Sequence, residues 1–187
     1  MERTLSFGRV RYLFDTIDVY ISDMQDDDEL ASDGYHNTPL FQKAEEIREL
    51  ATAIVEGAPD DAVATDPERQ RFAENMLEHS KDDIMANAYL IGAKIAGAYG
   101  MGLYDLQMEN ACLIRRACRE MVVALRGLEM GGHKEEAHFD LLRNAVKEFR
   151  PLFVEWVTTF KESDRMWDDW GLFNLPGDVP DSDYSPH

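Results

Sequence analysis

Two residues three positions apart, Glu135 and His138, have the types and the spacing that could bind a metal ion. They stand in the stretch GGHKEEAHFDLL, where a glycine pair precedes a helical pattern. Residues three apart lie one turn apart on the same helix face, so a carboxylate and an imidazole can reach one ion together. Glu74 and Glu78, on an earlier predicted helix, are expected at the same end of the fold. These four residues form a candidate site for a divalent metal.

The Glu-x-x-His spacing resembles the one that ferritin-like four-helix carboxylate proteins use to hold a metal pair. The resemblance implies a metal-binding bundle, with an oxidoreductase as one alternative function. Such a site requires a second Glu-x-x-His, and this sequence has one. The other interpretation is that Glu135 and His138 belong to the charged first turn of an ordinary helix, where acids favour the helix dipole. We therefore predict no cofactor and keep a divalent metal as the alternative.

The chain is strongly acidic, with 37 Asp and Glu against 19 Lys and Arg and a formal charge of −18. This argues against DNA or RNA as a partner, because neutralising phosphates supplies most of the affinity for nucleic acid. No stretch approaches the ~18 apolar residues of a membrane span, and the N-terminus has no secretory pattern. Cys112 and Cys118 are poorly placed to bridge each other. We expect a cytoplasmic protein with free thiols and no membrane contact.

Apolar residues recur with a helical period almost throughout the chain. The pattern predicts five helices, over residues 10–24, 39–57, 67–95, 103–128 and 135–160. Thr38-Pro39 and Asp66-Pro67 each provide a capping side chain followed by proline at the first helical position. Short glycine connections favour antiparallel packing of neighbouring helices. We therefore predict an all-α fold, an antiparallel bundle of four to five helices.

The last predicted helix has an apolar face of about half its circumference, which predicts a central position. The stretch WDDWGLFNLPG that follows, from Trp167 to Gly177, is aromatic but has no helical period. We expect it to fold back onto the helices and cover an exposed groove. Residues 1–177 then form a single domain, and the acidic residues 178–187 form a disordered tail.

One amide, Asn110, falls within about 20° of the apolar stripe of the predicted fourth helix. A buried amide must be hydrogen-bonded, or it costs about 2 kcal/mol or more. Small residues on the helix before it, including Gly92, indicate close helix approach or room for a bound molecule. Asn110 is therefore either a structural polar residue of the core or part of a small-ligand pocket with Gly92 and Trp156.

Arg115, Arg119 and Arg126 line the predicted fourth helix on the side away from its core. In so acidic a chain this stripe could pair with acids of the same chain, meet an acidic face of a second copy, or bind an anionic ligand. No nucleophile with a neighbouring base and no glycine-rich phosphate loop supports catalysis. We therefore predict a non-catalytic protein that acts by protein–protein interaction or self-association as a homodimer. A metal-binding bundle and a small-ligand sensor are the alternatives.

Overall fold

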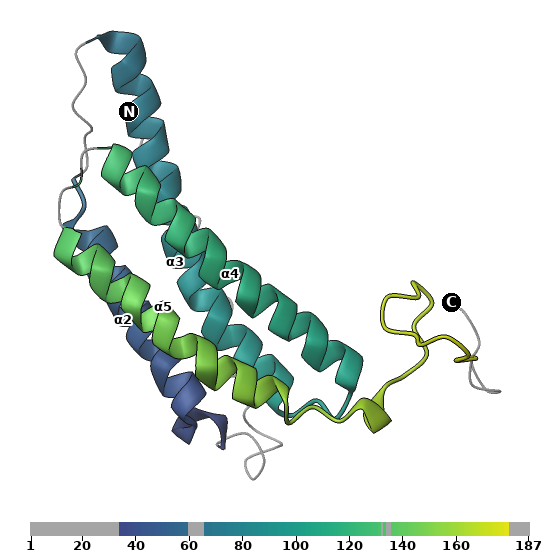
Figure 1. The fold of residues 1–187 in the computed structure, drawn as a ribbon. Helices are drawn as coiled ribbons and strands as arrows, with labels where there is room; N and C mark the ends of the chain where they lie inside the picture. The colour runs from purple at the N-terminus through teal and green to yellow at the C-terminus, as the bar shows by residue number, and fades with distance from the viewer. Residues whose placement is uncertain (1–33, 60–65, 132, 134–135, 180–187) are drawn as a thin grey trace, which may run out of the picture.

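The computed structural model describes residues 34–59, 66–131, 133 and 136–179 (Figure 1). These residues form four α-helices, which are α2 (Pro39–Gly57), α3 (Pro67–Tyr99), α4 (Tyr104–Met130) and α5 (Glu136–Val157). Two short 3-10 helices, η2 (Tyr35–Asn37) and η3 (Glu162–Asp164), precede α2 and follow α5. No strand occurs in these ranges, so the predicted all-α class is confirmed over them. The predicted helix over 10–24 lies outside the described residues.

Both predicted capping signals are confirmed at the starts of α2 and α3. Thr38 Oγ1 accepts a hydrogen bond from the backbone N–H of Phe41 at 3.2 Å. Asp66 Oδ1 accepts hydrogen bonds from the backbone N–H groups of Glu68 and Arg69, each at 3.1 Å. These bonds satisfy donors that have no partner inside the helix, and a cap of this kind is worth about 1 kcal/mol.

Side chains from all four helices form one apolar core. Ile47 of α2, Ile84 of α3, Met121 of α4 and Phe139 of α5 are each fully buried in it. Burying one such side chain stabilises the fold by about 1.5–3 kcal/mol. These four residues stand on the apolar faces that the helical period predicts, whereas Leu106 of α4 and Leu141 of α5, also on those faces, are exposed.

The helices differ in how closely they pack (Figure 1). The most extensive contact is between α3 and α4, which run in opposite directions on either side of a short connection. α2 packs on α3 and α5 packs on α2, whereas α4 and α5 contact each other only marginally. The predicted central position of the last helix is not confirmed, and Leu141 and Val154 on α5 remain exposed. Among the described helices only α3 makes an extensive contact with α4, and the side of α4 away from its core carries exposed side chains.

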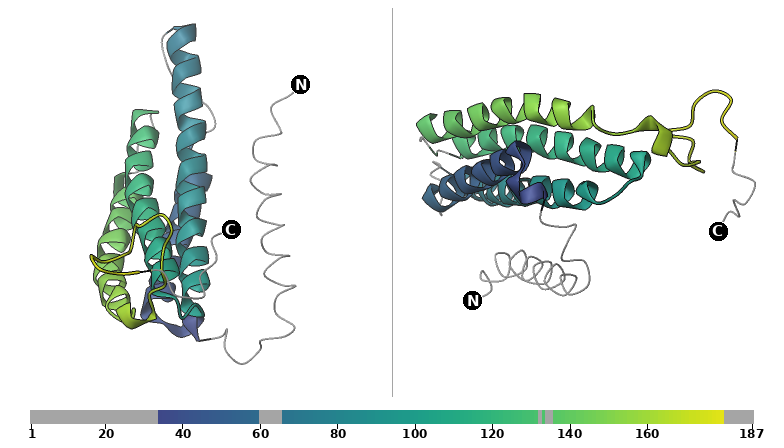
Figure 2. Two further views of the ribbon diagram at one scale, coloured as in Figure 1. Left: turned by 90° about the vertical axis from the view of Figure 1, so that its right-hand side faces the viewer. Right: turned by 90° about the horizontal axis from the view of Figure 1, so that it is seen from below.

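The aromatic segment after α5 does not cover a helix face in this structure. Figures 1 and 2 show residues 167–179 beyond the end of the helices, on the side where α4 begins. Trp170 is 95% exposed and Leu172 is 72% exposed. The segment is attached through the backbone N–H of Met166, which donates to Asp105 Oδ2 in the first turn of α4 at 2.8 Å. The predicted folding of the tail onto the helices is not confirmed.

Candidate functional site

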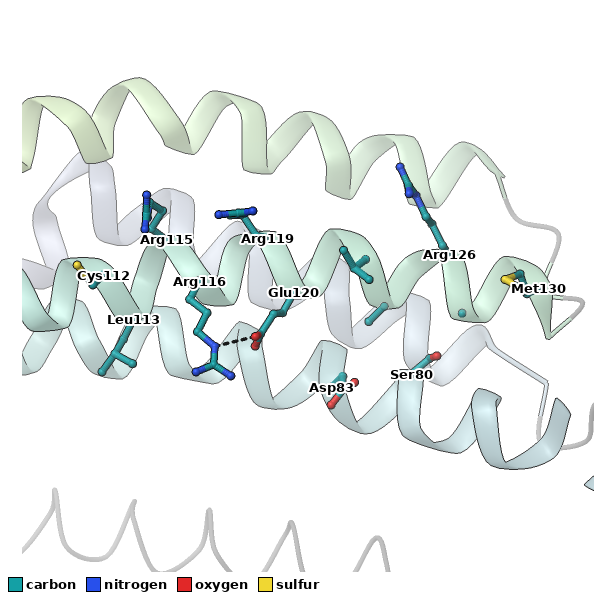
Figure 3. Close-up of a pocket in the computed structure, with 13 residues that line it drawn as sticks. Ser80, Asp83, Cys112, Leu113, Arg115, Arg116, Arg119, Glu120, Arg126 and Met130 are labelled. Atoms are coloured by element: carbon teal, nitrogen blue, oxygen red, sulfur yellow. Dashed lines mark hydrogen bonds and ion pairs between the residues drawn. The ribbon is translucent and has the colours of Figure 1, made fainter. Parts of the chain in front are cut away.

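An open groove runs along the outer side of α4 and is bordered by α3 (Figure 3). Its volume is about 1130 Å³. Drug-sized ligands usually occupy enclosed cavities of roughly 300–1000 Å³, so an open groove of this size fits a protein segment better than a small molecule. We call it the arginine groove. Its lining includes Cys112, Leu113, Arg115, Arg116, Arg119, Glu120, Val123, Arg126, Gly127 and Met130 of α4, with Ser80 and Asp83 of α3.

The arginine groove contains all three residues of the basic stripe that the sequence predicted. Arg115, Arg119 and Arg126 are exposed, and Figure 3 shows them pointing away from the side of α4 that carries Arg116. Arg116 Nε pairs with Glu120 Oε1 at 2.7 Å. Within the described ranges the other three form no such ion pair. Each guanidinium has five N–H donors, so the stripe can bind carboxylates of another molecule.

Apolar side chains lie beside these arginines. Val123 is 63% exposed and Met130 is 74% exposed, and both line the groove together with the half-buried Leu113. Arginine and methionine are enriched at protein–protein interfaces, where apolar side chains provide the buried centre of the contact. The groove therefore combines a charged and an apolar component of the kind that a protein surface would cover.

Gly127 allows α4 to approach α3 closely within this groove. A Cβ added at Gly127 would lie 2.0 Å from Ser80 Oγ and 3.1 Å from Ser80 Cβ. Ser80 is buried, so its side chain has little room to move away. Only glycine fits this crossing of the two helices without a shift of one of them.

The two cysteines differ in accessibility. Both are free thiols; Cys112 is exposed in the groove, and Cys118 is half-buried on the same helix. Burial raises the pKa of the Cys118 thiol to about 12. A thiol that stays protonated at neutral pH is a poor nucleophile. Cys118 is therefore suited to packing, and Cys112 offers an accessible position for a reporter group.

The described structure does not bring the predicted metal ligands together. Glu135 lies outside the described residues, and His138 on α5 and Glu78 on α3 are exposed. Glu74 Oε1 accepts a hydrogen bond from Gln70 Nε2 at 2.8 Å. α3 and α5 make no extensive contact, and no group of three or more His, Cys, Asp or Glu among the described residues could hold a metal ion. The hypothesis of a divalent metal rests on the sequence alone.

The predicted ligand-pocket residues lie on three different helices. Asn110 is half-buried rather than buried, and its Nδ2 donates to the backbone oxygen of Leu106 in its own helix at 2.9 Å. Gly92 faces α2, where an added Cβ would be in ordinary contact, 3.7 Å from the nearest atom. Trp156 stacks edge-on against Phe160, with ring centroids 4.7 Å apart. No described contact joins Asn110, Gly92 and Trp156, and none of them lines the groove.

A hydrogen-bonded loop over residues 167–179, which we call the tryptophan loop, was missed by the sequence analysis. The carboxylate of Asp168 accepts from the backbone N–H groups of Trp170 at 2.9 Å and Leu172 at 2.6 Å. Asn174 Oδ1 accepts a hydrogen bond from the backbone N–H of Asp168 at 3.0 Å, and Asn174 Nδ2 donates to the backbone oxygen of Asp168 at 2.7 Å. An aspartate that precedes a glycine turn by a few residues is the signal that could have indicated it.

Comparison with protein families, with curated proteins and with solved structures found no match for this chain. Within the described residues, none of the helices has the length and apolar character needed to cross a membrane. The candidate function therefore rests on the arginine groove and the tryptophan loop.

Proposed function

We propose that this protein acts by protein–protein interaction through the arginine groove, with a second copy of the chain as its partner. The observation that carries the proposal is the set of Arg115, Arg119 and Arg126, which form no ion pair within the described residues and lie in one open groove beside exposed Val123 and Met130. Surfaces that combine arginine with apolar side chains are typical of interfaces. In this proposal the helices act as an antiparallel bundle in the cytoplasm that holds α4 rigid.

The charge of the chain supports a second copy as the partner. A surplus of acids, 37 against 19 bases, means that another copy offers carboxylates to the arginine groove. Repulsion between the two acidic molecules is screened beyond about 8–10 Å at moderate ionic strength. Ion pairs in direct contact are screened less than these distant charges. Local pairing in the groove can therefore exceed the overall repulsion.

Sedimentation equilibrium of the wild type, Arg119→Glu and Arg71→Glu tests the proposal. We expect a wild-type dimer whose dissociation constant increases from about 0.1 M to about 1 M salt, because salt screens the pairs. Arg119→Glu should weaken the dimer at least about tenfold, since it places an acid against acids. Arg71 is an exposed residue of α3 outside the groove lining, so Arg71→Glu is a control with the same charge change.

Two results would overturn the proposed function. One is a wild type that stays monomeric at every concentration. The other is a dimer that responds equally to Arg119→Glu and Arg71→Glu, since net charge would then be the cause and the groove would have no part in it.

A further inference from the structure

The tryptophan loop presents large apolar side chains to solvent. Trp170 is 95% exposed, and Leu172 and Leu175 are 72% and 52% exposed. A tryptophan side chain buries about 150–250 Å² when it packs, and Trp170 leaves nearly all of this surface in water. Tryptophan is among the residues most enriched at the energetic centres of interfaces. Trp170 is therefore exposed in the way expected of a residue that anchors a contact with another protein surface.

The backbone around Trp170 is fixed before any partner binds. Both carboxylate oxygens of Asp168 accept loop N–H groups, and Gly171 has the left-handed φ of 68° that the turn requires. An ion pair of 3.3 Å joins Arg165, just before the loop, to Asp178 near the end of the loop. Asp178, which the sequence assigned to a disordered tail, therefore belongs to this loop. A preorganised loop loses less conformational entropy on binding than a flexible one.

The chemistry of the loop complements that of the arginine groove. Trp170 is flanked by the carboxylates of Asp168 and Asp169, and η3 adds two more acids just before the loop. The groove offers four arginines against the two acids Asp83 and Glu120. An arginine can stack on the face of an indole ring while its remaining N–H groups bond a carboxylate. The exposed leucines of the loop match the apolar part of the groove.

The loop does not lie over the groove of its own chain. It is attached at Asp105 in the first turn of α4, and Figure 1 shows it directed away from that helix. The groove lies further along α4, from Cys112 to Met130. A second copy related by a two-fold axis could place its loop there and receive the first copy's loop in return.

We propose that each copy inserts Trp170 into the arginine groove of the other, which gives a closed dimer with two identical contacts. This inference rests on the proposed function, because it requires the groove to be the self-association surface. It adds the occupant of the groove: an acidic, tryptophan-bearing loop from the partner copy.

A fluorescence experiment on the full chain tests the occupant directly. Bimane is attached to Cys112, the exposed thiol in the groove, on a chain that carries Trp170→Phe. Tryptophan quenches bimane on close approach, so adding unlabelled wild type should lower the fluorescence. Adding unlabelled Trp170→Phe is the matched control and should leave the fluorescence unchanged. Labelled wild type at high dilution tests whether Trp170 reaches Cys112 within one chain.

The outcomes separate this inference from the proposed function. Quenching by wild type and not by Trp170→Phe supports the inserted loop. Equal fluorescence with both additions, together with a dimer that Arg119→Glu disrupts, leaves the proposed function standing and overturns the inference. Labelled wild type that stays dimmer than labelled Trp170→Phe at any dilution shows closure within one chain and overturns it as well. Species larger than a dimer would contradict the reciprocal exchange.

A second measurement compares two truncations of exposed apolar side chains. Trp170→Ala should raise the dissociation constant of the dimer at least about 30-fold, as the loss of an interface anchor does. Val154→Ala on α5, where Val154 is 54% exposed, should leave it within about twofold. Because Trp170 is 95% exposed, the substitution leaves the fold intact, which the melting temperature confirms. An unchanged dissociation constant for Trp170→Ala would overturn the inference.

Discussion

The close approach of α3 and α4 at Gly127 leads to a prediction that separates helix propensity from packing. Replacing Gly127 by alanine in the last turn of α4 adds one methyl group. In an unobstructed helix this change stabilises a protein by about 0.4–1 kcal/mol. At Gly127 the added Cβ would lie 2.0 Å from Ser80 Oγ and 3.1 Å from Ser80 Cβ. The two effects have opposite signs, so the sign of the result shows which is larger.

The distances indicate that packing has the larger effect. Ser80 is buried, so its hydroxyl has little room to rotate away, and its Cβ is fixed to the α3 backbone. Relieving the two contacts therefore requires a helix shift. Adding a methyl group to a tight site of this kind costs about 1–3 kcal/mol. After subtracting the gain in propensity, we expect Gly127→Ala to lower the free energy of unfolding by about 1–2 kcal/mol. Gly97 of α3 has no neighbour within 4 Å, so Gly97→Ala should raise it by about 0.4–1 kcal/mol.

Urea unfolding measures both substitutions, read as shifts of the midpoint at an unchanged slope. Ser80→Ala removes the 2.0 Å contact, so Gly127→Ala should cost at least about 0.5 kcal/mol less in that background. A Gly127→Ala variant that is stabilised as Gly97→Ala is would refute a dominant packing cost. An effect of Gly127→Ala that is unchanged by Ser80→Ala would refute it too.

Three further predictions concern thiol reactivity, pH and a helix start. At about pH 8 a thiol reagent should modify Cys112 but not Cys118 in the folded protein, because burial raises the pKa of Cys118 to about 12; two labels by mass spectrometry before unfolding would contradict this. Burial and then the nearby Glu78 carboxylate raise the pKa of Asp82, so charged Asp82 destabilises the fold as pH rises from the usual value of 3.8 through its own pKa. Asp82→Asn should therefore increase the free energy of unfolding at neutral pH and lose this gain below pH 3.8. An equal gain at both pH values in urea unfolding would show that the charge on Asp82 is not the cause. Thr38→Ala should cost about 1 kcal/mol in the same assay and Thr38→Ser much less, because the hydroxyl caps α2; equal losses would show that the cap contributes nothing.

Features that depend on one helix at a time could be predicted from the sequence. The caps at Thr38 and Asp66 are decided by residues within one turn, and both form as expected. The exposure of Arg115, Arg119 and Arg126 follows from the position of the apolar stripe on the same helix. For these features the helical period is sufficient, because the positions of the other helices do not have to be known.

Features that depend on a second element could not be predicted in this way. The helical wheel placed Asn110 near the core, but one side of α4 has no close helix neighbour in the described structure, which leaves the amide half-buried. The need for glycine at Gly127 comes from Ser80, which is distant in sequence and close in space. Trp170 was expected to be covered because it is aromatic, whereas Asp168 holds the loop in a local turn that needs no helix surface.

In the proposed dimer the charge of −18 has a second consequence, because it sets which orientations of two copies can associate. Two such molecules repel each other in most relative orientations. Attraction arises where the arginine groove of one faces the acidic loop of the other, within a Debye length of about 8 Å at physiological ionic strength. Specificity then comes from repulsion elsewhere as much as from attraction in the groove. On this argument Arg119 governs mainly the association rate and its salt dependence, whereas Trp170, as an apolar anchor, governs how slowly the copies separate.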